Sequence, residues 1–456
     1  MKKRYEETIV GIATGFSKGA ISIIRLSGDE AIKIANSVFK GKNLEKVESH
    51  TVSYGHIIDY KTKEPIDEVL VSVFKEPRTY TKENVVEINC HGGVFVTNQI
   101  YENLLIAGAK PAEPGEFTKR AFLNGRIDLT KAEAVMDIID AENKNAVKLA
   151  NAGLSGKIAN TIRSLRQDVV NILAVISVNI DYPEYDDVEE LTNTELLPKL
   201  IEIKQFIENL LENSKSAKYL KEGINVAIIG KPNVGKSSLL NLLLGESRAI
   251  VTDIPGTTRD IIEAKVNINN ITLNLLDTAG IRSTTDIVEQ IGVEKAKESI
   301  NKADLVLMVI DTSQVLDSED LSLYNMVEGK PHILIGNKSD LTKKADLSLY
   351  NNEIVYISAL KNEGLSNLEN KITEVVFGEK GTIQDATYIS NARQVAKLND
   401  ALNALNEAIA KCYEQEYVDI IDIHIREAYL ALGEIIGDGS IDSLIDELFS
   451  KFCLGK

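Results

Sequence analysis

The chain has few cysteines and no long apolar segment, and these two absences restrict where it can work. Its 456 residues include only Cys90, Cys412 and Cys453, a wide, odd-numbered spacing that suits a reducing compartment and offers no metal-ligand pattern. No segment approaches about eighteen consecutive apolar residues, and the apolar stretch after Met1–Arg4 is broken before it resembles a secretory signal. The sequence therefore predicts a cytoplasmic protein that makes no use of a membrane.

Positive charge is also in short supply. Lysine and arginine number 51 against 68 aspartates and glutamates, which gives a formal net charge of −17. Proteins that bind nucleic acid mainly by electrostatics neutralise phosphates with clustered basic residues, so any RNA contact of this chain must be local. The hydrophobic share of 44% is that of an ordinary globular protein. The length predicts roughly two to four domains.

Hydrophobic periodicity divides the chain into four stretches. Short apolar runs alternate with helical patterns over residues 1–120, which predicts an N-terminal α+β domain. Residues 121–220 and 378–456 are helical in pattern, whereas strand-like runs alternate with helical segments over 221–377, as in a parallel sheet wrapped by helices. An example of the helical stripe is formed by Ile158, Ile162, Leu165, Val169 and Leu173. The expected fold is therefore multidomain, with an all-α helical domain interrupted by an inserted α/β domain.

A glycine-rich motif stands where a strand gives way to a helix. Residues 230–237 read GKPNVGKS, which matches GxxxxGK[ST], and they follow the strand-like run Ile224–Ile229. In such a loop the backbone amides and the helix dipole face phosphates, Lys236 reaches the β and γ oxygens, and Ser237 can ligate Mg²⁺. We therefore expect a P-loop nucleotide site here rather than a plain glycine-rich turn.

Two short segments predict that the base is guanine. The sequence NKSD at 337–340 follows a strand-like run, and Asp340 can accept hydrogen bonds from two donors of guanine that adenine lacks. A base without those donors would leave the carboxylate unpaired, which discriminates strongly between ligands. The segment SAL at 358–360 follows the next strand and fits the loop that closes over guanine in such domains. The inserted domain is therefore expected to be a P-loop GTPase domain.

Two other segments are expected to respond to the γ-phosphate. The sequence DTAG at 277–280 follows a strand-like run, so Asp277 can hold Mg²⁺ through water and the Gly280 amide can sense the phosphate. The segment TTRD at 257–260 can supply a threonine to the metal in the triphosphate state. Ras-like proteins next carry a glutamine that orients the attacking water, but here the residue is Ile281. Asp286 and Glu289 are the acidic candidates downstream.

Motifs inside and outside the α/β stretch carry a family resemblance. The segments GKPNVGKS, TTRD, DTAGIR and NKSD resemble those of GTPases that include Era and EngA. More specifically, GEFTKRAFLNGRIDLTKAEAV ahead of this stretch and FCLGK at the end of the chain resemble the MnmE (TrmE) family of tRNA modification GTPases. The resemblance covers all three regions of the chain.

This resemblance implies a function, cofactors and partners. Family members act with the flavoprotein MnmG (GidA) to place a carboxymethylaminomethyl- or aminomethyl-type group on C5 of the wobble uridine of tRNA. The one-carbon unit comes from 5-formyltetrahydrofolate, which is expected to bind the N-terminal domain. The family's GTPase domains pair across the nucleotide in a homodimer, K⁺ takes the place of an arginine finger, and GTP hydrolysis drives domain rearrangement.

The resemblance also implies individual site residues. Glu289 and Lys236 match catalytic positions, Ser237 and Thr258 match the Mg²⁺ ligands, and the K⁺ positions are matched by Asn233, Thr252, Ile254 and Thr257. The folate positions are matched by Arg25, Glu87, Arg126 and Lys456, although some members carry lysine in place of Arg126. Cys453 is either a reactive thiol near the folate or a small hydrophobe. All the expected nucleotide contacts are Asn233, Val234, Gly235, Lys236, Ser237, Ser238, Thr252, Asp253, Ile254, Pro255, Gly256, Thr257, Thr258, Asp277, Thr278, Ala279, Gly280, Asn337, Lys338, Asp340, Ser358, Ala359 and Leu360.

Two other functions compete with this one. A ribosome-assembly switch of the Era or EngA kind would carry a basic RNA-binding appendage or a second GTPase domain, and the sequence shows neither. A folate-dependent methyltransferase with a regulatory GTPase domain is the other alternative, because the sequence leaves open whether the N-terminal domain performs chemistry itself.

Overall fold

The fold is described from a computed structural model, which divides the chain into two compact units. The description covers residues 7–181, 196–245, 262–269, 271–276, 297–350, 353–377, 389–439, 442–452 and 455. One unit comprises Met1–Met136, Gly153–Glu189 and Asn403–Lys456, and the other comprises Asp137–Ala152 and Glu190–Leu402. We call them the N-terminal unit and the α/β unit, and each draws on segments far apart in the chain. The domain boundaries expected at residues 120, 220 and 377 stay predictions.

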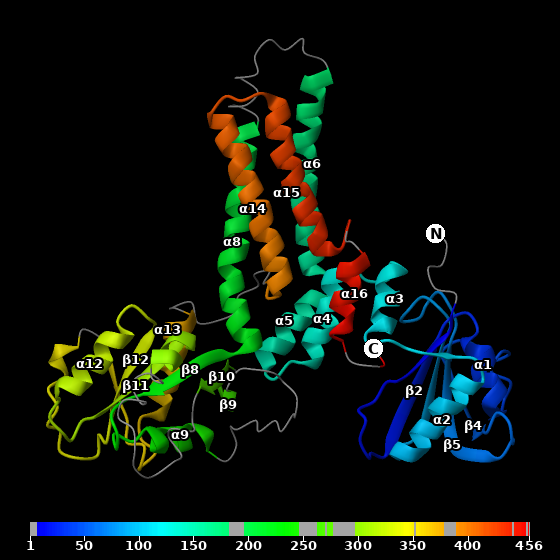
Figure 1. The fold of residues 1–456 in the computed structure, drawn as a ribbon, viewed down its shortest axis with the longest axis horizontal. Coiled ribbons are helices and arrows are strands. Elements are labelled where there is room, and N and C mark those ends of the chain that lie inside the picture. Colours follow the sequence, from blue (N-terminus) through cyan, green and yellow to red (C-terminus); the bar gives the residue numbers. More distant parts are fainter. Residues whose placement is uncertain are drawn as a thin grey trace. The chain divides into compact units, whose positions relative to one another are not determined.

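The N-terminal unit contains a seven-stranded sheet in the order β3-β4-β5-β6-β2-β1-β7. Its strands are β1 (Ile9–Ile12), β2 (Ile21–Ser27), β3 (Phe39–Gly41), β4 (Thr51–Ile58), β5 (Pro65–Phe74), β6 (Val85–His91) and β7 (Lys110–Pro111). Neighbouring strands are antiparallel except β1 and β7. Helices α1 (Ala31–Val38) and α2 (Val94–Ile106) pack against the sheet (Figure 1).

Period-two alternation in β4 explains why this sheet is covered on one face. Ser53 and Ile57 are buried, whereas Val52 and Tyr54, which flank Ser53, are exposed. Successive side chains of a strand point to opposite faces, so one face of β4 joins the core with α1 and α2 and the other stays open. The open face carries the charged residues discussed below.

Helices make up most of the remaining chain. They are α3 (Glu116–Leu123), α4 (Leu129–Ile139), α5 (Lys144–Leu154), α6 (Lys157–Asp181), α8 (Leu197–Glu222), α14 (Ala392–Tyr413), α15 (Val418–Ile436) and α16 (Asp442–Ser450). Within the N-terminal unit, α6 packs against α15 through the apolar stripe expected from the sequence. Ile162 and Val169 are buried as expected, but the stripe continues through Ile172 and not Leu173, which is only partly buried. A step of three residues after Val169 follows the helical period on this face.

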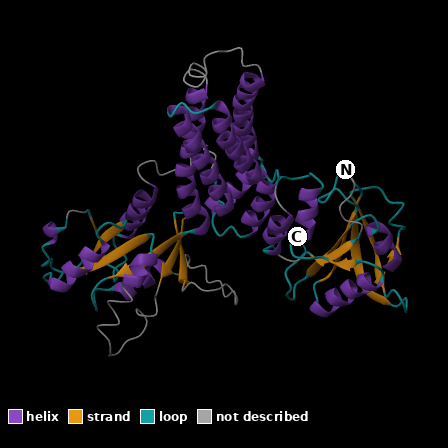
Figure 2. Ribbon diagram, turned by 45° about the horizontal axis from the view of Figure 1, so that its top comes forward, coloured by secondary structure: helices purple, strands orange, loops and turns teal. Residues whose placement is uncertain are grey.

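The α/β unit is built on a six-stranded sheet in the order β13-β12-β11-β8-β10-β9. The strands are β8 (Ile224–Ile229), β9 (Ile262–Ile268), β10 (Ile271–Leu276), β11 (Leu305–Asp311), β12 (His332–Asn337) and β13 (Ile354–Tyr356). Helices α9 (Lys236–Leu244), α12 (Ser318–Val327) and α13 (Leu365–Phe377) lie on both sides of the sheet (Figure 2), and a short 3₁₀ turn, η2, spans Leu347–Leu349. The expected multidomain fold with an inserted α/β domain is confirmed.

The edge strand β9 was not expected from the sequence. It runs antiparallel to β10, whereas the other strand pairs of this sheet are parallel. The two strands form a hairpin whose turn includes Asn269 at a φ of 50°, a left-handed conformation that asparagine tolerates better than most residues. The sequence IEAKVNI of β9 mixes polar and apolar residues, so it lacks the continuous apolar run that marked the buried parallel strands.

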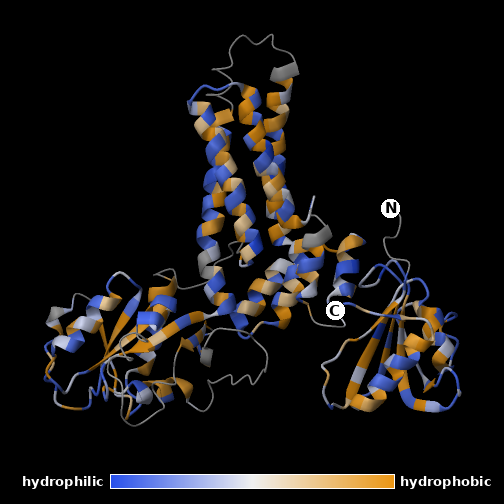
Figure 3. Ribbon diagram, in the orientation of Figure 1, coloured by the Kyte–Doolittle hydropathy of each residue, from blue (hydrophilic) through white to orange (hydrophobic). Residues whose placement is uncertain are grey.

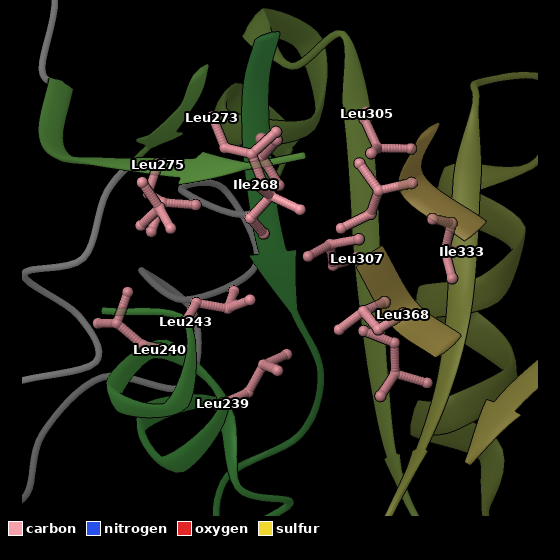
Figure 4. Packing of buried hydrophobic residues seen from close by; sticks show 14 of the residues in the cluster. Leu239, Leu240, Leu243, Ile268, Leu273, Leu275, Leu305, Leu307, Ile333 and Leu368 are labelled. Carbon is pink, nitrogen blue, oxygen red and sulfur yellow. The ribbon is translucent and has the colours of Figure 1, made fainter. Parts of the chain in front are cut away.

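Strand β11 shows how both faces of this sheet are buried. Leu305, Leu307 and Val309 join one core cluster with α9 and α13, and the residues between them join a second cluster with α12. Figure 4 shows the first cluster, in which Leu239 and Leu243 of α9 approach the sheet. Full burial of one such side chain is worth about 1.5–3 kcal/mol. The apolar strands appear as largely orange ribbons in Figure 3.

Residues 137–152 belong to the α/β unit, and polar contacts connect them to its sheet. The Asn143 side chain donates to Oγ1 of Thr272 at 3.1 Å and to the Leu220 carbonyl at 3.2 Å. Glu142 also forms an ion pair with Lys265 of β9. Asn143 is buried, so loss of its side chain would leave polar partners unsatisfied. Through these contacts the loop between α4 and α5 braces the hairpin of β9 and β10.

Candidate functional site

The glycine-rich motif forms the turn between β8 and α9. Gly230 has a φ of 148° and Gly235 a φ of 100°, both in the region that favours glycine. A side chain at Gly230 would collide with the Val309 carbonyl, and one at Gly235 would collide with the Asn337 side chain. The loop therefore needs glycine at both positions to lie this close to the ends of β11 and β12.

Lys236 is the first residue of α9, and its ammonium group is held inside the loop. Nζ donates to the carbonyl oxygens of Gly230 and Lys231 at 2.6 and 2.7 Å. Burial lowers the pKa of Lys236 despite the opposing charge of Glu319. The amine is thus already placed at a helix N-terminus, where backbone amides and the helix dipole favour phosphate.

Asn337 connects the phosphate side of the site to the base side. Its Nδ2 donates to the Val234 carbonyl at 2.9 Å, and its Oδ1 accepts from the backbone N–H of Ala359 at 3.1 Å. The residue is 2% exposed. Asn337 was expected among the nucleotide contacts, and the structure shows both ends of its amide bound to the protein. It braces the loop against the segment 358–360.

Asp340 is also fixed by that segment. Its Oδ1 accepts from Oγ of Ser358 at 2.7 Å, and Lys361 lies 3.9 Å from Oδ2. The hydrogen bond from Ser358 holds the pKa of Asp340 below its usual range, so the carboxylate is ionised at neutral pH. Leu360 is 86% exposed, whereas Ser358 is fully buried. The carboxylate that the sequence predicts to read guanine is therefore held in place by the segment 358–360.

The segments expected to sense the γ-phosphate lie outside the described residues, but the structure fixes where they leave the sheet. Ile262 at the start of β9 pairs in register with Leu276 at the end of β10. Leu276 in turn pairs with Ala227 of β8, the strand that leads into the loop. Outside the described residues are Thr252, Asp253, Ile254, Pro255, Gly256, Thr257, Thr258, Asp277, Thr278, Ala279, Gly280, Ile281, Asp286, Glu289, Cys453 and Lys456.

The remaining expected contacts of the α/β unit lie on the loop and the first turn of α9. Asn233 has a φ of 63°, and Ser237 and Ser238 belong to the first turn of α9. Within the part of the chain that the structure describes, no group of three or more acidic, histidine or cysteine side chains could hold a metal. A hydroxyl beside phosphates is instead the donor that suits Mg²⁺ in a P-loop, and Ser237 fits that role.

A second cluster of expected site residues lies on the open face of the N-terminal sheet. Arg25 of β2 and Glu87 of β6 are paired in register, and Nε of Arg25 lies 2.8 Å from Oε1 of Glu87. Arg25 also donates to the Gly455 carbonyl at 3.5 Å, next to the last residue of the chain. The guanidinium of Arg126 lies 4.8 Å from the ring centroid of Tyr80. We call Arg25, Glu87, Arg126 and Tyr80 the N-terminal cluster.

Three members of the N-terminal cluster border a cavity of about 470 Å³, whereas Arg25 is not among the residues that line it. Glu87, Arg126 and Tyr80 line it together with further basic residues, Arg78 and Lys82. These basic residues and Tyr80 were missed in the sequence, because the segment 77–82 contains no motif that sets it apart from an ordinary polar loop. A mixture of aromatic rings, cations and one carboxylate suits a flat ligand that carries both anionic groups and hydrogen-bond donors.

Comparison with known proteins places the chain in a family. A model for the N-terminus of the GTP-binding protein TrmE matches residues 8–126, and a model for the MnmE helical domain matches residues 129–453. A tRNA modification GTPase MnmE from Streptococcus pyogenes is 52% identical over 454 residues, which cover 99% of this chain and 98% of that protein. The chain belongs to the MnmE family of tRNA modification GTPases. The family expected from the sequence motifs is thereby confirmed.

A second relative agrees with this assignment. The tRNA modification GTPase MnmE of Ligilactobacillus salivarius is 52% identical over 455 residues, with 99% of this chain and 98% of that protein covered. Among solved structures, the G domain of the T. maritima FeoB iron transporter is 29% identical, and the match covers 33% of this chain and 98% of that domain, with a TM-score of 0.26.

In the described residues of the present chain, no helix is both long and apolar enough to cross a membrane.

Proposed function

We propose that this protein binds and hydrolyses GTP and uses the reaction in the modification of tRNA. The observation that carries the proposal is the hydrogen-bonded arrangement of Asp340, Ser358 and Asn337. It presents an ionised carboxylate for guanine and joins that carboxylate to the P-loop. A carboxylate that guanine alone can satisfy gives strong base selectivity. Membership of the MnmE family supports tRNA as the substrate that is modified.

The residues of the P-loop divide the work of phosphate binding. The Lys236 ammonium, now bonded to two carbonyls of the loop, would exchange those partners for the β and γ oxygens. Ser237 would hold Mg²⁺ together with Thr258, and the metal would neutralise charge that develops on the phosphates. The backbone amides at the start of α9 would accept the phosphates at the positive end of the helix dipole.

We propose that K⁺ supplies the charge that an arginine finger supplies in other GTPases. Ile281 cannot orient water, and family resemblance assigns that role to Glu289 and the K⁺ ligands to Asn233, Thr252, Ile254 and Thr257. A monovalent cation beside the β and γ phosphates would offset developing charge without side-chain entropy. GTPase domains of two chains would pair across the nucleotide in a homodimer.

Potassium dependence is the experiment that tests this part of the proposal. GTP turnover by the full chain should rise strongly when K⁺ replaces Na⁺ at equal ionic strength, because the smaller ion would not match the same oxygen ligands. Hydrolysis would be followed by phosphate release at saturating Mg²⁺. Equal rates in the two salts would remove K⁺ from the account and leave GTP binding untouched.

We propose that the N-terminal cluster binds 5-formyltetrahydrofolate. The cavity beside Arg126 and Glu87 supports this, because cations suit the glutamate tail and a carboxylate suits the donor edge of the pterin. Lys456 would join Arg25, whose contact with Gly455 brings the end of the chain to the cluster. Cys453 lies three positions before Lys456 and would be a reactive thiol of this site.

The folate would supply a one-carbon unit for C5 of the wobble uridine of tRNA. The product would be of the carboxymethylaminomethyl or aminomethyl type, and the flavoprotein MnmG would be the partner in the reaction. GTP hydrolysis would drive a rearrangement between the domains. A cytoplasmic location fits this role and the sparse cysteines of the chain.

A further inference from the structure

The carboxylate of Asp311 lies at the edge of the sheet that holds the guanine motif, yet it belongs to none of the motifs. Asp311 ends β11, and it pairs in register with Asn337 at the end of β12. Its side chain is 5% exposed. Oδ2 accepts from Nζ of Lys338 at 2.6 Å, and Oδ1 accepts from the backbone N–H and Oγ of Ser313 at 2.9 and 2.6 Å.

Lys338 is therefore held at both its backbone and its ammonium group. Its φ of 60° lies in the left-handed region, which a residue with a side chain adopts at a cost. The preceding carbonyl, that of Asn337, accepts from the backbone N–H and Oγ1 of Thr312 at 3.0 and 2.9 Å. The lysine thus spans from the end of β12 to the end of β11, at the carboxyl edge where ligands bind in such sheets.

Each charged side chain at this edge of the sheet has its own partner. Burial opposes ionisation of Asp311, but hydrogen bonds from Lys338 and Ser313 outweigh it and lower its pKa. The charge of Lys338 is therefore balanced by Asp311, whereas Lys236 stays with the phosphate loop. Asp340 keeps its own hydrogen bond from Ser358 and is left to read the base.

We propose that Asp311 is a positioning residue for the guanine site, because it anchors Lys338 so that the lysine stem packs along the bound base. The inference rests on the proposed function, since it requires a guanine nucleotide at this edge. It assigns different tasks to two neighbouring carboxylates. Asp311 sets how tightly the nucleotide is held, and Asp340 sets which base is accepted.

The test is a double-mutant cycle on GDP affinity, measured by equilibrium binding to the full chain. Asp311→Asn should weaken GDP binding about tenfold, the usual scale for losing one charged hydrogen bond. Lys338→Met should weaken it by a similar or larger factor. The double variant should bind no more weakly than Lys338→Met alone, because the carboxylate acts only through the lysine. Multiplying losses, or unchanged affinity in Asp311→Asn, would overturn the proposal.

Thermal unfolding supplies a second readout of the same cycle. Lys338→Met leaves a buried carboxylate without its cation, which destabilises strongly, so adding Asp311→Asn should raise the melting temperature again. If Asp311→Asn does not fold, Asp311→Glu replaces it in the cycle. With Lys338 present, Asp311→Glu should have an intermediate affinity for GDP. In the Lys338→Met background, it should not change the affinity further. Native GDP affinity of Asp311→Glu beside Lys338, or a further loss of affinity when Asp311→Glu is added to Lys338→Met, would contradict the proposal.

Two control variants separate this inference from the function on which it rests. Asp346 accepts from the backbone N–H and Oγ of Ser348 in a turn like that of Asp311 and Ser313, so Asp346→Asn should leave GDP affinity unchanged. Asp340→Asn should transfer preference from GTP toward xanthosine triphosphate, while Asp311→Asn should keep GTP selectivity. Retained GTP selectivity in Asp340→Asn would refute base reading itself, whatever the cycle at Asp311 shows. Altered selectivity in Asp311→Asn would refute the division of tasks.

Discussion

The proposed guanine site of the α/β unit and the N-terminal cluster are held together by different groups. In the α/β unit, Asn337 bonds to backbone groups of two segments, and Lys236 bonds to two carbonyls of its own loop. In the N-terminal cluster, Arg25 pairs with Glu87 and Arg126 stacks on Tyr80. Backbone groups hold Lys236 and Asn337 in the first site, although the Ser358 hydroxyl holds Asp340. In the second site, side chains that could each contact a ligand hold one another.

This difference predicts how each site responds to its ligand. The buried hydrogen bonds of Asn337 cannot be given up cheaply, so the link between the loop and segment 358–360 should keep its geometry when the nucleotide binds. Only the Lys236 ammonium is expected to exchange its carbonyl partners for phosphate oxygens. The ion pair of Arg25 and Glu87 is about one quarter exposed, at 23% and 24%, and pairs near water contribute little. Arg25 and Glu87 can therefore separate and bind a charged ligand at a small cost in free energy.

The largest effect is expected from removing the lysine of the P-loop. Lys236→Ala should lower GTP hydrolysis by about 10²–10³-fold, the usual loss when one preorganised donor to a transition state is removed. Phosphate release measured on the full chain checks this. Lys231→Ala is the matched control, because its ammonium points to Asp317 and Asp320 at 2.7 Å and its carbonyl remains. A similar loss in both variants would mean that the loop is merely distorted.

An intermediate effect is expected at the N-terminal cluster. Arg25→Ala should weaken binding of 5-formyltetrahydrofolate about 10–100-fold, because the variant loses one cation for the ligand and leaves Glu87 without its partner. Calorimetric titration would measure the affinity, and GTP hydrolysis should not change. Arg163→Ala removes another arginine of the same unit, paired with Asp128 at 3.1 Å, and should leave folate binding intact. Unaltered folate affinity in Arg25→Ala would separate the cluster from folate.

The smallest effect concerns another side-chain pair of the N-terminal sheet. The hydrogen bond and charge of Asp67 raise the pKa of His91, whose Nδ1 lies 2.7 Å from the carboxylate. An NMR titration should place the imidazole midpoint above the ordinary value of about 6.5, and Asp67→Asn should lower it. With a raised folded-state pKa, the pair stabilises the fold below the ordinary value, and this contribution fades as pH rises through the raised one. An unshifted midpoint would show no pairing in solution.

The sequence predicts the parts of this molecule that depend on local patterns. The P-loop, the strand before it and NKSD were visible because glycine spacing and apolar runs mark them, and β11 was marked by its continuous apolar residues. Strand β9 was not predicted, because its mixed polar and apolar residues, which suit a strand at the edge of a sheet, form no continuous apolar run. Nor could local patterns show that Ser358 bonds Asp340, that Asp311 holds Lys338 or that Gly455 reaches Arg25. Those contacts join distant segments, which only the fold brings together.

The most direct test of the central claim is nucleoside analysis of tRNA from cells that lack this protein. The account predicts that the wobble uridines lose their C5 modification and that the native chain restores it. Lys236→Ala should fail to restore it, because the modification depends on GTP hydrolysis. Unchanged wobble uridines in the deleted cells, together with altered ribosome assembly, would contradict the account and favour an Era- or EngA-like switch.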